Sequence, residues 1–158
     1  MRNALFFIIL AFAANTLQAQ IDSTKAFESC RGKLPLPVKH FTKVIDNSKN
    51  SKNVCMYQFN PSTAFISDKQ DSVFSIHEGS VVSVYEVDSS NFAIMIKYGQ
   101  YFLVYFPIDA PFLKKGDYIK AKQFIGFLKK EYEDYRIQIQ LYNKQMKEFV
   151  AYNWFKWP

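Results

Sequence analysis

Apolar and polar positions alternate with a period of two in the C-terminal part of the chain. In residues 135–142 the apolar set is Ile137, Ile139 and Leu141, and the polar set between them is Arg136, Gln138 and Gln140. Successive side chains of a β-strand point to opposite faces, so this period predicts a strand. We expect the two sets to lie on its opposite faces.

Compact apolar and aromatic runs predict further strands upstream. Residues 92–96 and 101–105 are two such runs, and Gly99 and Gln100 lie between them, as a tight hairpin turn requires. Residues 81–86 also alternate. Aromatic residues make up 18% of the chain, which favours strands and a sheet core. The expected fold class is all-β, with antiparallel sheets and hairpins.

Two stretches are expected to lie outside the strands. Residues 46–53 are polar and rich in turn-forming residues, which predicts a surface loop. Residues 128–134 are expected to form a short helical turn or a loop. We find no internal repeat and no coiled-coil heptads, and a chain of 158 residues suits one domain.

The N-terminus has the organisation of a secretory signal peptide. Arg2 precedes a short apolar run at 5–14, and Ala19 supplies the small residue expected before a cleavage site. The run is shorter than the roughly 20 residues that a transmembrane helix needs. The expected parts are a signal peptide at 1–19, a short tail at 20–30 and one domain at 31–158. We therefore expect export and no transmembrane span in the mature chain; the tail could start with a helical turn or remain loose.

The chain carries two cysteines, Cys30 and Cys55. In an oxidising compartment such a pair could form a disulfide, and closing a loop of this size would stabilise the fold by about 3 kcal/mol. The pair lacks the C-x-x-C spacing of redox sites, and two thiols without paired histidines make a poor zinc site. We expect a Cys30–Cys55 disulfide.

The charge is moderately basic. Removing Arg2 with the signal peptide leaves 19 Lys and Arg residues against 14 Asp and Glu residues, a net charge of about +5. Such a protein could meet an anionic wall polymer or lipid head groups, or its lysines could serve solubility alone. A group of lysines flanks one predicted turn: Lys114, Lys115, Lys120 and Lys122.

Five segments, in order and spacing, resemble the LytM/lysostaphin-type metallopeptidase family. They are RGKLPLPV at 31–38, VFSIHEGSVV at 73–82, IKYG at 96–99 with LVY at 103–105, KGDYIKAKQFIG at 115–126 and NWF at 153–155. The first is similar to the entry segment of murein-hydrolase activators of the EnvC type, which usually carry a long coiled coil that this chain lacks. The resemblance covers residues 31–157 and implies a LytM-like β-sandwich with a groove.

The resemblance also implies where zinc ligands would stand. The family's H-x-x-x-D motif falls on Asn60 and Ala64, and its H-x-H motif falls on Arg136 and Gln138. A further active-site histidine of the family falls on Pro107. Zinc hydrolysis needs three protein ligands and an open position for water. We therefore expect no metal, no cofactor and no catalysis, in a degenerate peptidase fold.

The two histidines, His40 and His77, do not coincide with these positions. We expect both to be ordinary surface or turn residues. The sequence also has no glycine-rich phosphate loop, no G-x-S-x-G motif and no basic helix of the type that reads DNA, so a nucleic-acid partner is not expected. A cysteine nucleophile at Cys30 or Cys55 is a weaker interpretation than the disulfide.

A LytM-like groove without metal is a candidate binding surface. By position in the family, it would be lined by Asn60, Tyr98, Tyr105, Arg136 and Gln138. The resemblance implies a bacterial envelope protein, periplasmic or extracellular, that regulates a murein hydrolase such as an amidase or binds peptidoglycan. One alternative is an envelope structural or interaction domain without a wall partner. A second is an active peptidoglycan endopeptidase, zinc-dependent or using unfamiliar residues.

Overall fold

The computed structural model describes residues 19, 23–47, 62–88, 90–145 and 148–158. A short helix at 23–28 precedes the strands. The strands are β1 (Lys43–Asp46), β2 (Thr63–Ser67), β3 (Ser72–Phe74), β4 (Gly79–Asp88), β5 (Asn91–Tyr98), β6 (Tyr101–Asp109), β7 (Tyr118–Ile119), β8 (Phe124–Glu131), β9 (Asp134–Asn143) and β10 (Glu148–Phe149). A 3₁₀ helix, η2 (Ala151–Trp154), follows them.

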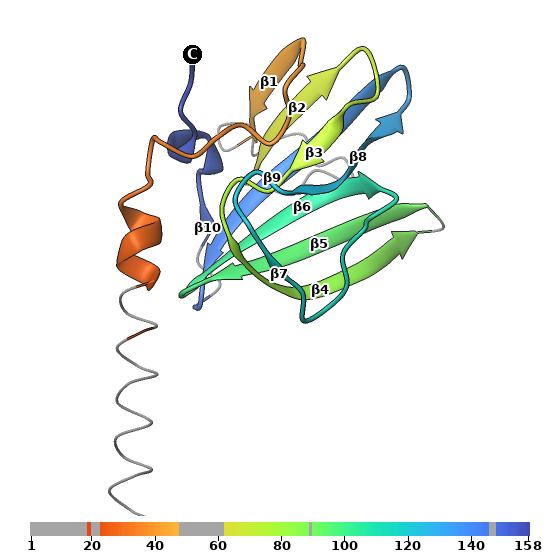
Figure 1. The fold of residues 1–158 in the computed structure, drawn as a ribbon. Helices are drawn as coiled ribbons and strands as arrows, with labels where there is room; N and C mark the ends of the chain where they lie inside the picture. Colours follow the sequence, from red (N-terminus) through yellow and green to blue (C-terminus); the bar gives the residue numbers. More distant parts are fainter. Residues whose placement is uncertain (1–18, 20–22, 48–61, 89, 146–147) are drawn as a thin grey trace, which may run out of the picture.

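The strands form one ten-stranded sheet in the order β1-β2-β9-β8-β6-β5-β4-β7, with β3 added to β8 and β10 added to β9. Strand β9 also pairs with β6, and every pairing between named strands is antiparallel. The sheet curls, so β1, β2, β3 and β8 lie above β4, β5 and β7 (Figure 1). The predicted all-β fold with antiparallel strands and hairpins is confirmed.

The turn between β5 and β6 matches its sequence prediction. Tyr98 pairs with Tyr101, which leaves Gly99 and Gln100 as the two turn residues. Gly99 has a φ of 52°, a conformation that glycine adopts without steric cost. A Cβ at this position would lie 2.6 Å from Oγ1 of Thr24, so the turn also needs glycine to admit the N-terminal helix.

Residues 128–134 differ from the prediction of a helical turn or loop. Residues 128–131 complete β8, and Asp134 begins β9 opposite Glu131. Only Tyr132 and Glu133 form the turn, and Tyr132 has a φ of 58°. Residues 129–134, KKEYED, lack the apolar side chains that usually indicate strands. The outer end of this strand pair is exposed and needs no apolar side chains.

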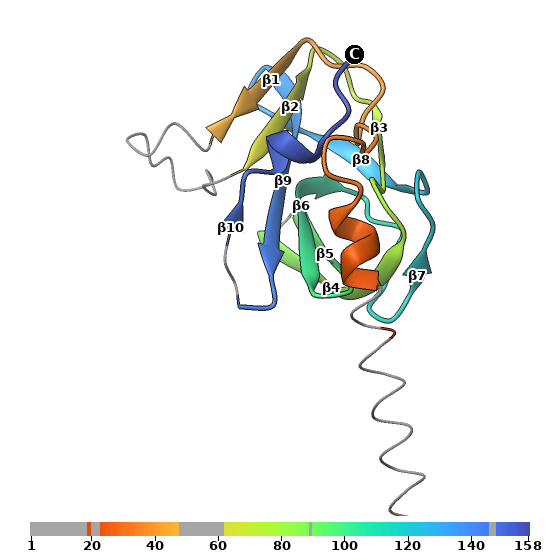
Figure 2. The same ribbon diagram turned by 90° about the vertical axis from the view of Figure 1, so that its left-hand side faces the viewer.

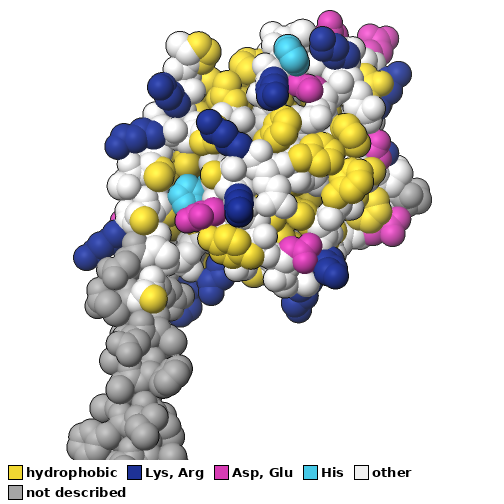
Figure 3. Space-filling model, viewed as in Figure 1, with side chains coloured by type: hydrophobic (Ala, Val, Ile, Leu, Met, Phe, Trp, Pro, Cys, Tyr) yellow, Lys and Arg dark blue, Asp and Glu magenta, His cyan; other side chains and the backbone are white. Residues whose placement is uncertain are grey.

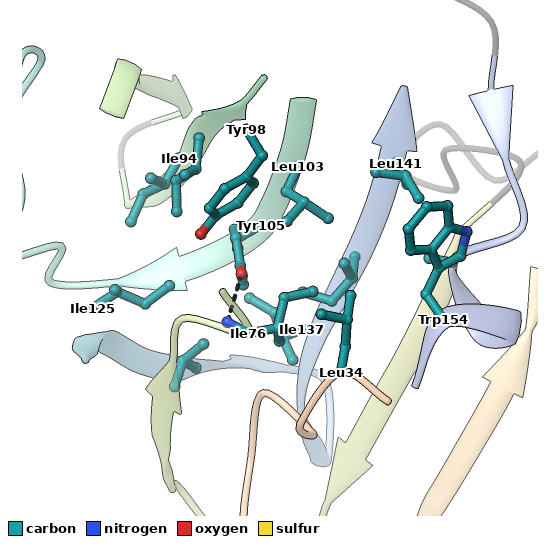
Figure 4. Packing of buried hydrophobic residues seen from close by; sticks show 14 of the residues in the cluster. Leu34, Ile76, Ile94, Tyr98, Leu103, Tyr105, Ile125, Ile137, Leu141 and Trp154 are labelled. Atoms are coloured by element: carbon teal, nitrogen blue, oxygen red, sulfur yellow. Dashed lines mark hydrogen bonds between the residues drawn. The ribbon is translucent and has the colours of Figure 1, made fainter. Parts of the chain in front are cut away.

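The hydrophobic core lies between the two halves of the curled sheet. Figure 4 shows side chains from both halves directed into one space, among them Ile94 and Leu103 from β5 and β6 and Ile137 and Leu141 from β9. Trp154 of η2 closes one end of this cluster. The core therefore uses the apolar set that the alternation in β9 predicted.

The predicted tail at 20–30 contributes a helix that packs on the sheet. Figure 2 shows the helix at 23–28 lying across β5 and β6. Phe27 is fully buried, and its ring stacks on Tyr98 at 5.3 Å and on Trp154 at 4.8 Å between ring centroids. Within the described part of the chain, no helix has the length and apolar character needed to cross a membrane.

Candidate binding site

The register of β2 and β9 brings two of the expected zinc-ligand positions together. Ala64 lies directly opposite Gln138, although 73 residues separate them in the sequence. Residues paired in an antiparallel sheet present their side chains on the same face. The side chains of Ala64 and Gln138 therefore lie next to each other on one face of the sheet. Alanine, however, offers no donor atom beyond its backbone.

Gln138 is engaged in a buried hydrogen-bond relay. Ser62 Oγ donates to Gln138 Oε1 at 3.2 Å, and Asn47 Nδ2 donates to Ser62 Oγ at 2.9 Å. All three side chains are buried, so each depends on its protein partners in place of water. Through this relay Gln138 links β9 to Ser62 and, by way of Ser62, to Asn47. These two residues lie on either side of residues 48–61 in the sequence.

Arg136 occupies the other H-x-H position and forms an ion pair. Its Nε lies 3.0 Å from Oε2 of Glu131, on the neighbouring strand β8. Burial raises the pKa of Glu131, while the positive charge of Arg136 opposes that rise. A guanidinium group cannot act as a metal ligand because it stays protonated, and its charge repels a cation.

These residues do not fit a zinc ion. Ala64 lacks a donor atom, Gln138 presents an amide oxygen that Ser62 already occupies, and Arg136 is a cation. In the ranges that the structure describes, no three His, Cys, Asp or Glu side chains come together as a metal would require. Asn60, the remaining expected position, lies outside the described residues.

The two histidines serve local contacts. His40 is exposed, and its Nδ1 lies 3.2 Å from Oδ2 of Asp71. The backbone N–H of His40 also donates to that carboxylate, and with the imidazole it lowers the pKa of Asp71 against the opposing effect of burial. His77 packs edge-on against the rings of Phe27 and Tyr98. Both agree with the expectation of surface or turn residues.

Tyr105 lies in the core. Its side chain has no exposed area, and its hydroxyl accepts a hydrogen bond from the backbone N–H of Ile76 at 3.1 Å (Figure 4). Tyr105 pairs with Ile139, whereas Phe106 pairs with Gln138, so Tyr105 and Gln138 lie on opposite faces of the sheet. Burial raises the pKa of the Tyr105 hydroxyl above its usual value.

Tyr98 closes the space beneath the N-terminal helix. Its hydroxyl donates to the backbone carbonyl of His77 and lies 3.3 Å from Ser75 Oγ. Burial raises the pKa of this hydroxyl as well. A Cβ at residue 79 would lie 2.5 Å from the Tyr98 ring, so Gly79 permits the ring to reach this position.

A pocket of about 210 Å³ opens beside Tyr98, between the N-terminal helix and the edge formed by β4, β5 and β7. Ser23 and Ala26 line it from the helix, and Lys97, Glu78 and His77 line it from the sheet. It therefore combines an aromatic wall with one acidic, one basic and one imidazole group. Such a mixture suits recognition of a polar ligand or a protein side chain.

The structure divides the predicted groove residues into two groups. Tyr98 borders the pocket near the helix, and Tyr105 lies behind it in the core. Arg136 and Gln138 lie on the opposite face of the sheet, and Asn60 is outside the described residues. Cys55 is also outside them, so the Cys30–Cys55 disulfide remains a prediction.

The sequence interpretation missed the contribution of the N-terminal helix. Thr24 Oγ1 accepts a hydrogen bond from the backbone N–H of Gln100 at 3.1 Å, and the Tyr101 hydroxyl donates to Glu28 Oε1 at 2.7 Å. The signal available in the sequence was Phe27, a large apolar residue within an otherwise polar segment. Its burial required a partner surface that only the folded sheet provides.

Comparison with known proteins yields matches of fold. No protein-family model matches the chain, and none of the curated proteins matches it. Among solved structures, Csd3 of Helicobacter pylori superposes with a TM-score of 0.62 at 18% identity, over 79% of this chain and 35% of that one. This chain thus spans about a third of Csd3. A chain of the SpoIIIAH–SpoIIQ complex superposes with a TM-score of 0.62 at 16% identity, over 78% of this chain and 100% of that one.

A third match is a putative glycyl-glycine endopeptidase LytM from Ruminococcus gnavus, with a TM-score of 0.61, 15% identity, and coverage of 80% of this chain and 61% of that one. At such identities the likeness concerns the fold alone. The curled antiparallel sheet and these superpositions agree with the resemblance read in the sequence motifs. The chain has the fold of LytM-type peptidases, in a degenerate form.

Proposed function

We propose that this chain is an exported, non-catalytic LytM-like domain that binds a partner in the bacterial envelope, most directly a murein hydrolase that it regulates. The proposal is carried by the residues that stand at the ligand positions implied by the family resemblance. Ala64 and Gln138 still face each other across two strands, yet one has no donor atom and the other is held by Ser62. A fold kept while its ligands are replaced points to binding.

The pocket beside Tyr98 is the surface that we assign to the partner. Gln138 is buried and Tyr105 is fully enclosed, so neither offers area to a partner. Glu78 is exposed and His77 and Lys97 are partly exposed, around an opening of about 210 Å³. A partner side chain could enter this opening and pair with either charge.

The SpoIIIAH–SpoIIQ complex supports a protein partner, because a chain of comparable fold there is part of a protein–protein assembly. Peptidoglycan is the second candidate partner. It is favoured by the basic charge of the chain, which suits an anionic polymer. A domain that serves envelope assembly without a wall partner is the alternative that the experiment below must separate from both.

The test measures how the purified protein affects a wall amidase encoded in the same genome. We expect the wild type to stimulate cleavage of purified sacculi, and Glu78→Lys and His77→Ala to reduce that stimulation about tenfold or more, as loss of a central contact does. Glu133→Lys is the matched control, because it makes the same charge change at the exposed β8–β9 turn. It should stimulate like the wild type.

Three outcomes would overturn parts of the proposal. Binding to sacculi without any effect on the amidase would favour peptidoglycan as the partner. The absence of both effects would favour envelope assembly. Stoichiometric zinc in the purified protein, together with cleavage of sacculi when no amidase is present, would contradict the non-catalytic assignment.

A further inference from the structure

Four phenylalanine rings pack against one another outside the hydrophobic core. Their ring centroids lie 6.3 Å apart for Phe74 and Phe124, 5.1 Å apart for Phe124 and Phe127, and 5.2 Å apart for Phe112 and Phe124. None of the four belongs to the buried core cluster, and Phe112 is 64% exposed. A preformed group of apolar rings at the surface indicates an interaction site.

An irregularity in β8 creates this group. Val73 pairs with Gly126 and Phe74 pairs with Phe124, so the register shifts and one residue of β8 is extra. Without that bulge, Phe124 and Phe127 would point to opposite faces, because their spacing is odd. With it, Ile125 enters the core while both rings face outward. The exposed rings thus follow from the backbone.

Exposed lysines lie close to the rings, one by a direct contact and four by their place in the sequence. Lys39 Nζ lies 5.3 Å from the centre of the Phe74 ring. Two turns carry the other four, Lys114 and Lys115 after Phe112, and Lys120 and Lys122 before Phe124. Asp117 Oδ2 accepts from the Lys114 backbone N–H and Gln123 Oε1 accepts from the Lys120 backbone N–H, each at 2.9 Å. These bonds fix the backbone of the two turns, and Lys114 and Lys122 each lie two residues along the chain from a ring, Phe112 and Phe124.

Two acids next to β8 are paired with other side chains. Asp71 contacts His40, and Asp109 lies 3.7 Å from Lys129 Nζ. Residues 110–124 contain four lysines and one acid, Asp117. Figure 3 views the molecule from the side of β3, β7 and β8, and shows hydrophobic side chains gathered there, with Lys and Arg side chains above and below them and Asp and Glu side chains at the edges of the group. The face formed by the four phenylalanines and these five lysines is called the lysine–aromatic face below.

We propose that the lysine–aromatic face docks on an anionic phospholipid bilayer. Aromatic rings favour the boundary between head groups and acyl chains, and lysines beside them favour anionic lipid. A soluble anionic polymer would engage the lysines and leave the rings in water. A second copy of this chain would bring lysines against lysines. A bilayer satisfies both components. Tyr118, which lies between the two pairs of lysines, lines the pocket beside Tyr98, so the two surfaces adjoin. The vesicle test below contains no partner protein, so its result does not rest on the proposed function.

The test measures co-sedimentation of the full chain with vesicles. We expect binding to phosphatidylcholine vesicles that contain a third phosphatidylglycerol, and little binding to pure phosphatidylcholine. Each lysine near an anionic surface contributes roughly fivefold to partition, so Lys114→Gln with Lys115→Gln should weaken binding about 25-fold. Phe112→Ser should weaken it several-fold without unfolding, because its ring is mostly exposed.

The matched control is Lys43→Gln with Lys156→Gln, which removes the same charge from β1 and the C-terminal segment. It should bind within about twofold of the wild type, since a local site and not net charge is at work. All variants share one N-terminus, so any contribution from residues 1–19 cancels in the comparison.

Four results would overturn the inference. If the control lost as much vesicle binding as the Lys114/Lys115 variant, net charge and not this face would account for the binding. Binding to soluble polyphosphate as strong as to vesicles, and unaffected by Phe112→Ser, would assign the lysines to a soluble polymer. If the protein bound pure phosphatidylcholine vesicles as strongly as those with phosphatidylglycerol, the lysines would not contribute to binding. The absence of vesicle binding would assign the face to a protein partner.

Discussion

The two faces of β9 carry different kinds of side chain, although both are buried. One face presents Ile137, Ile139 and Leu141 to the core, where they pack among side chains from both halves of the sheet. The other presents Gln138 and Gln140, which are 3% and 4% exposed. The apolar face depends on shape and area, and the polar face depends on specific partners such as Ser62 for Gln138. This difference between the two faces indicates that side chains on the polar face could be replaced while the fold is retained.

A core that relies on packing tolerates few changes, whereas a buried polar position tolerates those that keep its hydrogen bonds. The ligand positions of the resembled peptidases fall on the polar face, at Ala64, Arg136 and Gln138. Their replacement leaves the apolar face intact. This separation agrees with a LytM-type fold that is shared with solved structures at identities of 15–18%.

The largest expected effect is on the apolar face. Ile139 is fully buried, so Ile139→Ala should lower the free energy of unfolding by about 2–5 kcal/mol, through lost burial and the cavity that remains. Urea denaturation followed by tryptophan fluorescence measures this. A loss below about 1 kcal/mol would mean that the core closes around the missing atoms, and would break the contrast between the two faces.

Gln138→Ala tests the polar face next to it. The change deprives the buried Ser62 hydroxyl of its acceptor, which should cost about 1–3 kcal/mol in the same denaturation experiment. Gln138→Glu serves as the companion variant, because it keeps an oxygen acceptor at the same reach. If Gln138→Ala proved as costly as Ile139→Ala, the two faces would be equally constrained and the explanation above would fail.

Tyr101 tests how firmly the N-terminal helix is held on the sheet. Tyr101→Phe removes the hydrogen bond to Glu28 and should cost about 1 kcal/mol. Burial, reinforced by Glu28, raises the pKa of Tyr101 from 10.0 to about 12. Because the folded-state pKa is the higher one, this stabilisation is complete below pH 10 and is lost as the pH rises toward 12.

The measurement is the free energy of unfolding at neutral pH and above pH 10, with hydrogen exchange of residues 23–28 recorded in parallel. Wild type should lose stability at alkaline pH more steeply than Tyr101→Phe. The buried hydroxyls of Tyr98 and Tyr105, whose pKa values are also raised, should leave part of the loss in both proteins. Identical pH profiles would show that Tyr101 does not couple the helix to the sheet.

The smallest expected effect is at the β8–β9 turn. Tyr132 is 92% exposed and has a left-handed φ of 58°. Tyr132→Asn should raise the free energy of unfolding by less than about 1 kcal/mol, because asparagine tolerates this conformation better and no packing is lost. A clear destabilisation in thermal melts would reveal a contact of the Tyr132 ring that its exposure does not suggest.

Strands with strong local signals were accessible to sequence reasoning. The alternation around Ile137 and Ile139 located β9, and Gly99 with Gln100 located the β5–β6 turn. The prediction of a short helical turn or loop at 128–134 was wrong: these residues form the end of a hairpin, and their charged side chains reflect exposure. The N-terminal helix was left undecided because Phe27 is stabilised by rings of residues far away along the chain, such as Tyr98 and Trp154.

The candidate site shows the same division. The sequence by itself determined that Ala64 cannot supply a ligand and that the strand of Gln138 has two unlike faces, because these are properties of side chains and of local period. Only the tertiary structure decided that Ala64 and Gln138 meet, that Tyr105 points into the core on the other face, and that Phe27 covers Tyr98. Such contacts join distant segments, and they depend on strand register and sheet curvature, which arise from the packing of the whole chain.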